Sequence, residues 1–550
     1  MEKRTVLAIV ISIIFILIWQ KMVVDKVNPP KKITKTVVAV NEKEKATERK
    51  TEAIQSNETV ALSEGSVNKT SRTETDSESV NGESGKEASS GKVVDLPEEI
   101  ISLENKVLKL EFTNKGGRLV SVQLKDYRDE IGEKMELVNQ VMLEKNLTPF
   151  SFEGKLNYLN NIGFTAQKDR NSVSFLYQEG LKRIEKRFEL DKGFGLKVAV
   201  VSTGFGPAEI SLGPGIDSAE KSHSRYSTPD AVVVFADGSV DRIKKEKLDG
   251  VDVSKQKPEW VAIEDKYFAK IFTPDTKEMK ILGAIKSYKG KKKDLLLSDV
   301  LLVGNQISGT IFLGPKDYDV LKKLGHHYAK IVNFGFFGVF AKWLFFALRW
   351  INGLVHNYGW SIILLTILIR LLIFPVSQAG LRSMKDMQRV QPKMKEIQAK
   401  YKKFGKDLTK KQEMNREIQE LYKKEGVSPL GGCLPMILQM PIFFAFWSLL
   451  LNVIELRHAP FMFWIQDLSA YDPYYVLPVL MGVTQLISQM ITPSTGDANQ
   501  KKMMYALPVV FTVVLATAPS GLIVYWTTNN LFQIVQQMLV NRSMKEAEGE

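Results

Sequence analysis

The chain has 550 residues, with 75 Lys+Arg against 62 Asp+Glu for a net charge of +13, and 44% of its residues are hydrophobic. The single cysteine, Cys433, excludes an intrachain disulfide framework and any multi-cysteine metal site, and five histidines leave little material for a histidine metal centre. The mean hydropathy of -0.10 averages over apolar and charged segments that are separated along the chain. A nucleic-acid interpretation of the charge therefore depends on where the lysines and arginines lie.

The first 92 residues predict an anchor followed by a tether. The apolar run Val6–Trp19 follows Lys3 and Arg4, and it leads into polar residues without the small-residue motif that ends a cleaved signal peptide. Residues 1–24 are therefore expected to form an uncleaved transmembrane anchor, with a signal peptide as the alternative. Residues 25–92 contain no aromatic residue and are rich in Ser, Thr, Glu and Lys, a composition that predicts a disordered tether.

Residues 93–320 have the two-residue periodicity of β-strands. The alternating segments Val107–Phe112 and Arg118–Leu124 flank Gly116-Gly117, which is the pattern of a strand, a tight turn and a second strand. Further strand candidates are Val173–Tyr177, Phe188–Leu190, Leu196–Ser202, Ala231–Phe235 and Lys280–Ile285. Many short strands with few helical stretches predict an all-β antiparallel sandwich domain.

Residues 321–356 are expected to form an amphipathic interfacial helix. Phe336–Val355 is apolar enough to cross a bilayer, but Lys342, Arg349 and His356 recur every seven residues and share one helical face. A helix with a cationic stripe and an aromatic body favours the plane of the membrane interface, and a true span is the alternative.

Five apolar stretches in the rest of the chain approach the length that a helix needs to cross a bilayer. They cover about residues 359–376, 433–453, 473–491, 503–518 and 520–540. The connection Ser377–Ser428 holds 14 Lys+Arg and 7 Asp+Glu, whereas the connections after the second and fourth stretches carry almost no positive charge. By the positive-inside rule, the basic connection, the tail 543–550 and the N-terminus are cytoplasmic, and the β domain is extracytoplasmic.

The basic connection has a helical periodicity of its own. A heptad seam runs through Met387, Val390, Met394, Ile397 and Tyr401, and a returning helix supplies Met414, Ile418 and Leu421. This predicts a helical hairpin over 380–425 with a net charge of +7. The charge can fix the topology alone, or it can also dock RNA, anionic lipid or a nascent chain. The lysines expected to dock a partner are Lys393, Lys395, Lys400, Lys402, Lys403 and Lys406.

Arg370 is the one residue of definite charge within the five stretches. An arginine at mid-membrane costs about 2.5–3.5 kcal/mol and usually marks a functional site, although snorkelling toward the basic connection is the alternative. Neutral amides share the stretches, and Asn530, Gln533 and Gln537 lie on one helical face. One cation among amides predicts a wet cavity for polar peptide groups, and the lack of an in-span carboxylate argues against a proton relay or a cation transporter. Phosphate-loop, H-E-x-x-H and G-x-S-x-G motifs are missing.

The C-terminal part contains a set of specific motifs. They are Gly359-Trp360-Ser361-Ile362, Gln391-Pro392-Lys393, Ser428-Pro429-Leu430-Gly431-Gly432-Cys433-Leu434-Pro435, Gln439-Met440-Pro441-Ile442-Phe443, Asp467-Leu468-Ser469, Asp472-Pro473-Tyr474-Tyr475 and Pro519-Ser520-Gly521-Leu522. In these motifs the chain resembles the YidC family of membrane protein insertases, over essentially all of Gly359–Arg542. The β domain is similar, more loosely, to the periplasmic domain of the long bacterial form, at Asn114-Lys115-Gly116-Gly117 and Trp260-Val261-Ala262.

The resemblance implies a multidomain membrane protein. An all-β periplasmic supersandwich would be joined to an α-helical five-span membrane core (357–542) with a cytoplasmic helical hairpin. The core would hold a hydrophilic groove open to lipid, with Arg370 as its arginine and with Thr366, Tyr525 and Trp526 where the family contacts substrate. The expected groove also includes the in-span amides Gln439, Gln485, Gln489, Asn530 and Gln533.

The implied function is that of an insertase and chaperone, which moves hydrophobic segments of nascent proteins from the cytoplasm into the bacterial inner membrane. No nucleotide hydrolysis, enzymatic chemistry, metal or cofactor is expected. The expected partners are nascent membrane proteins, the Sec translocon, the ribosome through the basic hairpin, and membrane lipids, but no DNA. A polytopic transporter with an extracytoplasmic β domain is the first alternative.

A membrane-anchored carbohydrate enzyme is the second alternative. The periplasmic supersandwich of the family resembles that of sugar mutarotases, which use paired histidines with a carboxylate. His223 is the only histidine between Val93 and Pro315, so we expect no sugar chemistry in the β domain.

Overall fold

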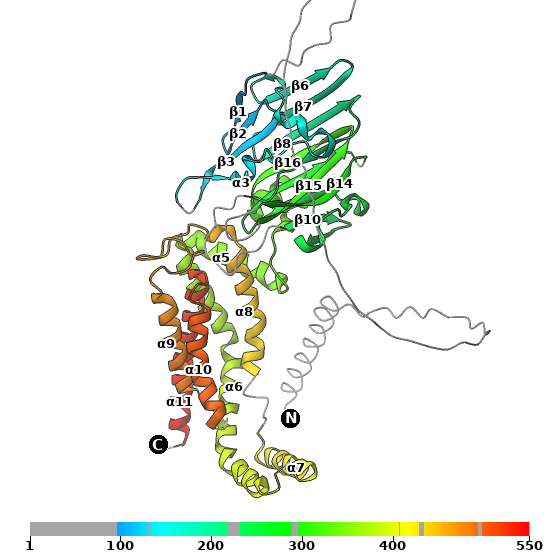
Figure 1. Ribbon diagram of the computed structural model, residues 1–550. Helices are drawn as coiled ribbons and strands as arrows, with labels where there is room; N and C mark the ends of the chain where they lie inside the picture. The colour runs from blue at the N-terminus through cyan, green and yellow to red at the C-terminus, as the bar shows by residue number, and fades with distance from the viewer. Residues whose placement is uncertain are drawn as a thin grey trace, which may run out of the picture. The chain divides into compact units, whose positions relative to one another are not determined.

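The computed structural model of the protein describes residues 96–129, 131–216, 231–276, 278–288, 295–405, 407–427, 434–492 and 498–548. The predicted anchor 1–24, the predicted tether 25–92 and Lys406 lie outside the described residues. The described part consists of a β-rich domain followed by a helical region (Figure 1). This division into a β domain and a helical C-terminal part confirms the coarse architecture that the sequence predicts.

The described strands of the β domain form three sheets in which neighbouring strands are antiparallel. The first sheet has the order β1 (Ile100–Glu104), β2 (Leu108–Thr113), β3 (Arg118–Arg128) and β4 (Lys134–Glu136). The second has the order β11 (Ser239–Ile243), β10 (Ala231–Ala236), β12 (Trp260–Glu264), β13 (Phe268–Pro274), β16 (Gln306–Pro315), β8 (Gly195–Thr203), β7 (Lys182–Leu190), β6 (Ser172–Glu179) and β5 (Thr165–Lys168). The third has the order β14 (Lys280–Tyr288), β15 (Leu295–Gly304) and β9 (Ala208–Ser211). Short helices connect the strands at α3 (Gln140–Leu143), η2 (Gly154–Asn161), η3 (Lys245–Lys247) and η4 (Val253–Gln256).

The predicted strand, turn and strand at the start of the domain are confirmed as β2 and β3. Leu108 pairs with Leu124 across the hairpin. Gly116 and Gly117 in the connection have φ angles of 69° and 56°, a conformation that favours glycine. A Cβ atom on Gly117 would lie 2.9 Å from the Cβ of Phe175 in β6, so the turn packs directly on the second sheet. The main hydrophobic core takes buried side chains from all three sheets, which explains why alternate residues of β2 are apolar.

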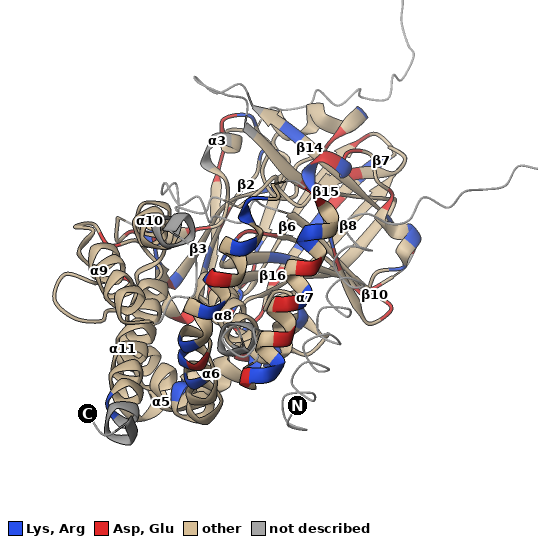
Figure 2. Cartoon of the chain, turned by 90° about the horizontal axis from the view of Figure 1, so that it is seen from below, with Lys and Arg blue, Asp and Glu red and all other residues tan. Residues whose placement is uncertain are grey.

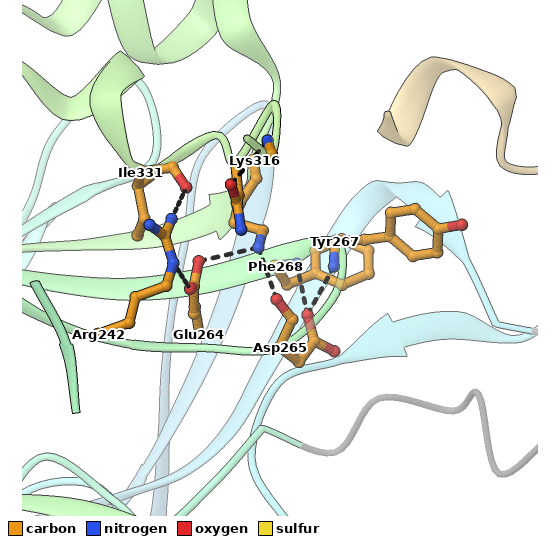
Figure 3. A network of polar contacts seen from close by, with 9 residues as sticks. Arg242, Glu264, Asp265, Tyr267, Phe268, Lys316 and Ile331 are labelled. Atoms are coloured by element: carbon orange, nitrogen blue, oxygen red, sulfur yellow. Dashed lines mark hydrogen bonds and ion pairs between the residues drawn. The ribbon is translucent and has the colours of Figure 1, made fainter. Parts of the chain in front are cut away.

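A buried ion network joins the second sheet to the chain that leaves it (Figure 3). Glu264 at the end of β12 accepts hydrogen bonds from Arg242 Nε at 2.8 Å and from Lys316 Nζ at 2.9 Å. Lys316 also donates to the backbone carbonyl of Asp265, and Arg242 donates to the backbone carbonyl of Ile331. One buried carboxylate therefore compensates two cations, one on β11 and one directly after β16, which holds the exit of the chain against the sheet.

The interfacial helix predicted over 321–356 is divided in the structure, so its predicted beginning is wrong. Two short helices come first, α4 (Tyr318–Leu324) and η5 (Tyr328–Ile331), and the amphipathic helix is α5 (Gly338–Val355). The helix breaks because Gly325 ends α4 with a φ of 77° and Gly335 has a φ of 74°, conformations outside the right-handed helical region.

The predicted cations of α5 contact the preceding helix in the structure. Arg349 pairs with Asp319 of α4 at 2.5 Å, and Lys342 Nζ lies 5.1 Å from the centre of the Tyr318 ring. The cations therefore attach α5 to α4. Trp343 and Trp350 are exposed, so the uncovered face of α5 among the described residues is aromatic.

The helical region contains α6 (Tyr358–Lys402), α7 (Leu408–Glu425), α8 (Leu434–Asn452), η6 (Ile454–Leu456), α9 (Val476–Ile491), α10 (Ala498–Val514) and α11 (Ser520–Glu548). Helix α11 packs against α9, α6 and α8, and α10 packs against α9 (Figure 1). Each of the five apolar stretches lies on one of these helices. Within the described residues, α5 and α6 are the helices long and apolar enough to cross a membrane, and shorter apolar helices cover Gln439–Asn452, Val476–Ile491 and Met504–Val514.

Helix α6 is continuous over 45 residues, whereas the sequence predicts a span that ends at 376 and a separate hairpin helix from 380. Pro375 and Pro392 lie inside the helix. A proline removes one backbone donor and kinks a helix, but the residues after Pro375 include the strong helix formers Ala379 and Leu381, which favour continuation. The membrane stretch and the first half of the basic hairpin therefore form one helix.

The ends of two other helices differ from the predicted limits. Helix α9 begins at Val476, later than the predicted 473, and α10 ends at Val514 before the predicted 518. The carboxylate of Asp472 accepts hydrogen bonds from the backbone N–H groups of Tyr474 and Leu477 and from the indole of Trp464. These bonds hold the residues before α9 in a turn, which delays the start of the helix.

Candidate functional site

The predicted groove arginine lies in the interior of the helical region. Arg370 on α6 is 7% exposed, and its Nε donates a hydrogen bond of 2.6 Å to Oδ1 of Asn529 on α11. Among the described residues, Arg370 has no carboxylate in an ion pair and no acceptor bonded to its terminal nitrogens. A guanidinium has five N–H donors in a fixed fork, so most of its donor capacity is left for another group.

Polar groups of three helices meet around Arg370. Thr366 lies one turn before Arg370 on α6, and its hydroxyl donates to the Ile362 carbonyl of the same helix. Tyr525 lies one turn before Asn529 on α11, and its hydroxyl accepts a hydrogen bond of 3.2 Å from Nε2 of Gln439 on α8. One-turn spacing places each pair on one helical face, so α6 and α11 present two polar layers to each other.

Aromatic packing fixes the tyrosine of this site. Tyr525 is buried, and its ring stacks on Phe446 of α8 with ring centres 4.5 Å apart. Trp526 is half-buried and contacts Phe443 of α8 and Phe511 of α10 at ring-centre distances of 5.0 Å and 5.5 Å. These two neighbours on α11 therefore join α8 to α10, and Trp526 does so through the packing of its ring.

The other predicted groove residues do not gather at Arg370. Asn530 donates to the Met481 carbonyl and to the Thr484 hydroxyl on α9. Gln485 and Gln489 of α9 and Gln533 of α11 are half-buried. The predicted set therefore divides: one group lies around Arg370 on α6, α8 and α11, Asn530 joins α11 to α9, and the three glutamines lie on α9 and α11 without a contact to Arg370 among the described residues.

Asn529 is the site residue that the prediction missed. It is one of several in-span amides, and spacing alone did not distinguish it from Asn530 next to it. The absence of any in-span carboxylate indicated that an amide oxygen would accept from the arginine, but it did not indicate which amide.

Large apolar side chains cover the outer faces of the same helices. The exposed ones on α6 are Leu364, Leu368, Leu371 and Leu372, those on α9 are Val479, Leu480, Val483 and Ile487, and those on α10 are Leu507, Val509, Val510 and Val513. A soluble surface rarely exposes so many contiguous apolar side chains, so this surface is suited to lipid.

The C-terminal half of α6 and α7 form a charged helical arm. Figure 2 shows acidic and basic residues along α7, in contrast to α9, which has no charged residue. Lys393 pairs with Glu425 at 2.6 Å and Lys400 with Glu417 at 3.0 Å, which ties the two helices together. All five predicted docking lysines that the structure describes are exposed on the arm: Lys393, Lys395, Lys400, Lys402 and Lys403.

Comparison with known proteins gives the family. A model described as the YidC periplasmic domain matches residues 100–347, and a model described as the 60Kd inner membrane protein matches residues 350–547. The chain belongs to the YidC family of membrane protein insertases. It therefore combines an inner-membrane part with a periplasmic domain, and the two matched regions meet within α5.

Individual relatives agree with this assignment. The membrane protein insertase YidC of Geobacter sulfurreducens is 33% identical over 471 residues, which cover 80% of this chain and 85% of the relative. That of Syntrophus aciditrophicus is 32% identical over 580 aligned residues, which cover 98% of this chain and 100% of the relative.

Solved structures with similarity include YidC proteins and mutarotase-like proteins. An active YidC insertase with its first transmembrane domain resolved is 20% identical, with 80% of this chain and 92% of that chain covered and a TM-score of 0.35. A galactose mutarotase-like protein from Lactobacillus casei is 13% identical, with 40% of this chain and 100% of that chain covered and a TM-score of 0.25. The assignment to the family rests on the sequence matches.

Proposed function

We propose that this insertase moves hydrophobic segments of nascent proteins from the cytoplasm into the inner membrane through a lipid-open hydrophilic groove around Arg370. The observation that carries the proposal is the buried guanidinium, which is bonded to one amide and has free terminal N–H groups among the described residues. A buried charge in this position costs free energy, so a residue that carries one usually has a function. Binding the polar or acidic groups of a client chain is such a function.

The proposed topology has five spans, on the first part of α6 and on α8, α9, α10 and α11. The exposed apolar side chains of these helices support it, because they would face lipid. The N-terminus, the charged arm and the C-terminal tail are placed in the cytoplasm and the β domain in the periplasm, in accordance with the positive-inside rule. In this topology α5 lies at the periplasmic interface of the inner membrane, with its aromatic face toward lipid.

The mechanism follows from the cost of polar groups in hydrocarbon. A partly translocated client would rest its polar outer segment beside Arg370, Asn529 and Tyr525. Removing that segment from hydrocarbon lowers the penalty for unpaired peptide groups and for acidic side chains. The apolar segment then partitions into the adjacent lipid and drives the process at roughly 25 cal/mol per Å². The process requires no nucleotide.

The proposed partners follow from the same topology. The charged arm would meet the ribosome at the cytoplasmic face, where its net positive charge attracts ribosomal RNA. The Sec translocon is a further proposed partner.

A site-specific crosslinking experiment tests the groove. A photo-crosslinking residue at Gln439 should label a ribosome-stalled membrane protein, because this side chain bonds Tyr525 at the site. The matched control is Leu181 in the β domain, which is fully exposed and remote from the site in the chain. Labelling of the client at Leu181 with none at Gln439 would contradict the groove.

A further inference from the structure

The short connection after α8 takes part in two hydrophobic cores. Val453 and Leu456 are buried in the core of the helical region. Ile454, which lies between them, is 5% exposed and belongs to the main core of the β domain. The turn η6 therefore sends neighbouring side chains into different cores, and it attaches the C-terminal end of α8 to the β domain.

An aromatic contact extends the attachment. The Arg457 guanidinium carbon lies 5.5 Å from the centre of the Phe268 ring in β13. The Phe268 ring meets the Tyr127 ring of β3 edge to face, with ring centres 5.8 Å apart. We call residues 453–457 the joint, because they contact strands of two different sheets and the core of the helical region.

A carboxylate without a donor lies in the middle of the joint. The Oε1 atom of Glu455 is buried and accepts no hydrogen bond from the described residues. An ionised carboxylate loses its hydration there without compensation, whereas a protonated one carries no charge to desolvate. Burial accordingly raises the pKa of Glu455 to about 7. The closed joint therefore favours the protonated form of this side chain.

The charged and titratable groups that face Glu455 come from several elements. They are Asp317 at the N-terminus of α4, Asp319 in α4, Arg349 in α5, Tyr358 in α6 and Tyr127 in β3, with Arg457 in the joint itself. Both aspartates raise the pKa of Glu455 further, while a hydrogen bond from its own backbone N–H and the charge of Arg349 lower it. Arg349 is already paired with Asp319, so it compensates Glu455 only in part.

We propose that the joint is a proton-sensitive contact between the β domain and α8, closed when Glu455 is protonated and loosened when it is ionised. The inference rests on the proposed topology, in which the joint faces the periplasm and responds to periplasmic pH. Helix α8 also carries Gln439 and Phe446, which contact Tyr525 at the groove. The joint therefore holds one end of a helix that forms a wall of the groove.

The raised pKa determines the direction of the effect. In an opened joint Glu455 is exposed to water and returns toward its ordinary pKa of 4.5, so the closed joint binds the proton more tightly. The closed joint is fully stable below this value, loses stability as the pH rises to about 7, and changes no further above it. Between about pH 5.5 and about pH 8, the equilibrium should shift toward the open joint by about tenfold or more.

Hydrogen exchange of the full-length protein in neutral-lipid nanodiscs tests the proposal. The backbone N–H groups of Leu456 and Arg457 donate to the Val453 and Ile454 carbonyls in the closed joint, so their exchange reports its opening. Glu455→Gln keeps the shape of the side chain and cannot ionise. Dividing the wild-type rate by the variant rate at each pH cancels the pH dependence of chemical exchange. This ratio should rise by about tenfold or more from about pH 5.5 to about pH 8.

A matched control separates the joint from a general effect of charge. Glu246→Gln removes an exposed carboxylate on η3 of the β domain, and its ratio to the wild type should stay constant with pH. A constant ratio for Glu455→Gln, or an equal rise for both variants, would overturn the proposal.

A second variant tests the charged surroundings of Glu455. Asp317→Asn removes a neighbouring negative charge and keeps the oxygen that caps α4, so the helix should stay folded. The pH at which the wild-type joint opens should move to a lower value in this variant, because the pKa of Glu455 falls. A purely structural role of Glu455 predicts no movement, so an unchanged pH of opening would contradict the proposal.

Failure of the joint and failure of the groove give different results. Arg370→Ala should leave the exchange of the joint unchanged and slow insertion. If the exchange ratio stays constant with pH while Arg370→Ala slows insertion, the joint inference fails and the proposed function stands. If the ratio rises as expected but Arg370→Ala inserts every client at full rate, the proposed groove fails and the joint stands.

Discussion

Replacing Arg370 by alanine should slow the insertion of clients with acidic outer segments far more than that of neutral clients. A carboxylate about 4 Å from the guanidinium gains ~4 kcal/mol at an effective dielectric constant of about 20. Desolvation of the two charges offsets about half of this gain. The remaining ~2 kcal/mol corresponds to about a thirtyfold change in rate.

The structure supports this estimate in two ways. Arg370 is 7% exposed, so its charge is poorly screened by water, and its one bonded neighbour, Asn529, is neutral. No carboxylate of the described residues competes with the client for the guanidinium. Asn529→Ala keeps the charge and removes the group that orients it, for which we expect a loss of only ~1 kcal/mol.

The assay is insertion of a single-span client into liposomes that contain the purified protein, followed by protease protection. One client has two aspartates in its outer segment, and its matched control has two asparagines. Arg370→Ala should slow the first about thirtyfold and the second only several-fold, whereas Arg370→Lys should keep most of the activity if charge matters more than the fork geometry. Equal slowing of both clients by Arg370→Ala would refute the electrostatic reasoning.

Three further predictions concern stability and packing. Burial raises the pKa of Asp299 to about 6, so folding takes up a proton and this group's contribution to stability falls as the pH rises from about 4 to 6. Asp299→Asn should remove this pH dependence in thermal unfolding and add up to about 3 kcal/mol to the free energy of unfolding at pH 7. An unchanged pH dependence in this variant would count against the reasoning. Glu264→Ala leaves two cations without their shared carboxylate and should lower the free energy of unfolding by about 3 kcal/mol. The control Glu185→Ala breaks an exposed ion pair and should lower it by under about 1 kcal/mol. Similar melting temperatures of the two variants would show that the network is not stabilising. Gly482→Leu places a side chain where α9 contacts α10, so it should lower stability by about 1–3 kcal/mol and slow insertion. The control Gly353→Ala on α5 meets open space and should be tolerated. A stable and active Gly482→Leu variant would exclude close packing of α9 on α10.

The architecture of the helical region could be predicted because apolar stretches of nearly 20 residues have few alternatives to a helix. The limits of the elements were less predictable. The chain continues as a helix through Pro375 because the residues around it favour a helix, and it breaks before α5 because Gly325 and Gly335 adopt positive φ angles. Such outcomes depend on the balance of neighbouring preferences, which a single residue type does not reveal.

The β domain shows the same division. Alternation and the Gly116-Gly117 turn predicted β2 and β3, since both depend on residues close in the chain. The buried network of Glu264 with Arg242 and Lys316 joins β12 to β11 and to the residue after β16, and it could not be read from spacing because Glu264 is 22 and 52 residues away from its two partners.

At the candidate site, the sequence alone determined that one buried cation lies among amides, and that no in-span carboxylate is present to neutralise it. The tertiary structure decided which amide accepts the hydrogen bond of Arg370. Asn529 bonds Arg370, whereas Asn530 turns to Met481 and Thr484 on α9. Consecutive residues on an α-helix point about 100° apart, so two chemically identical neighbours face different helices once the packing around α11 is set.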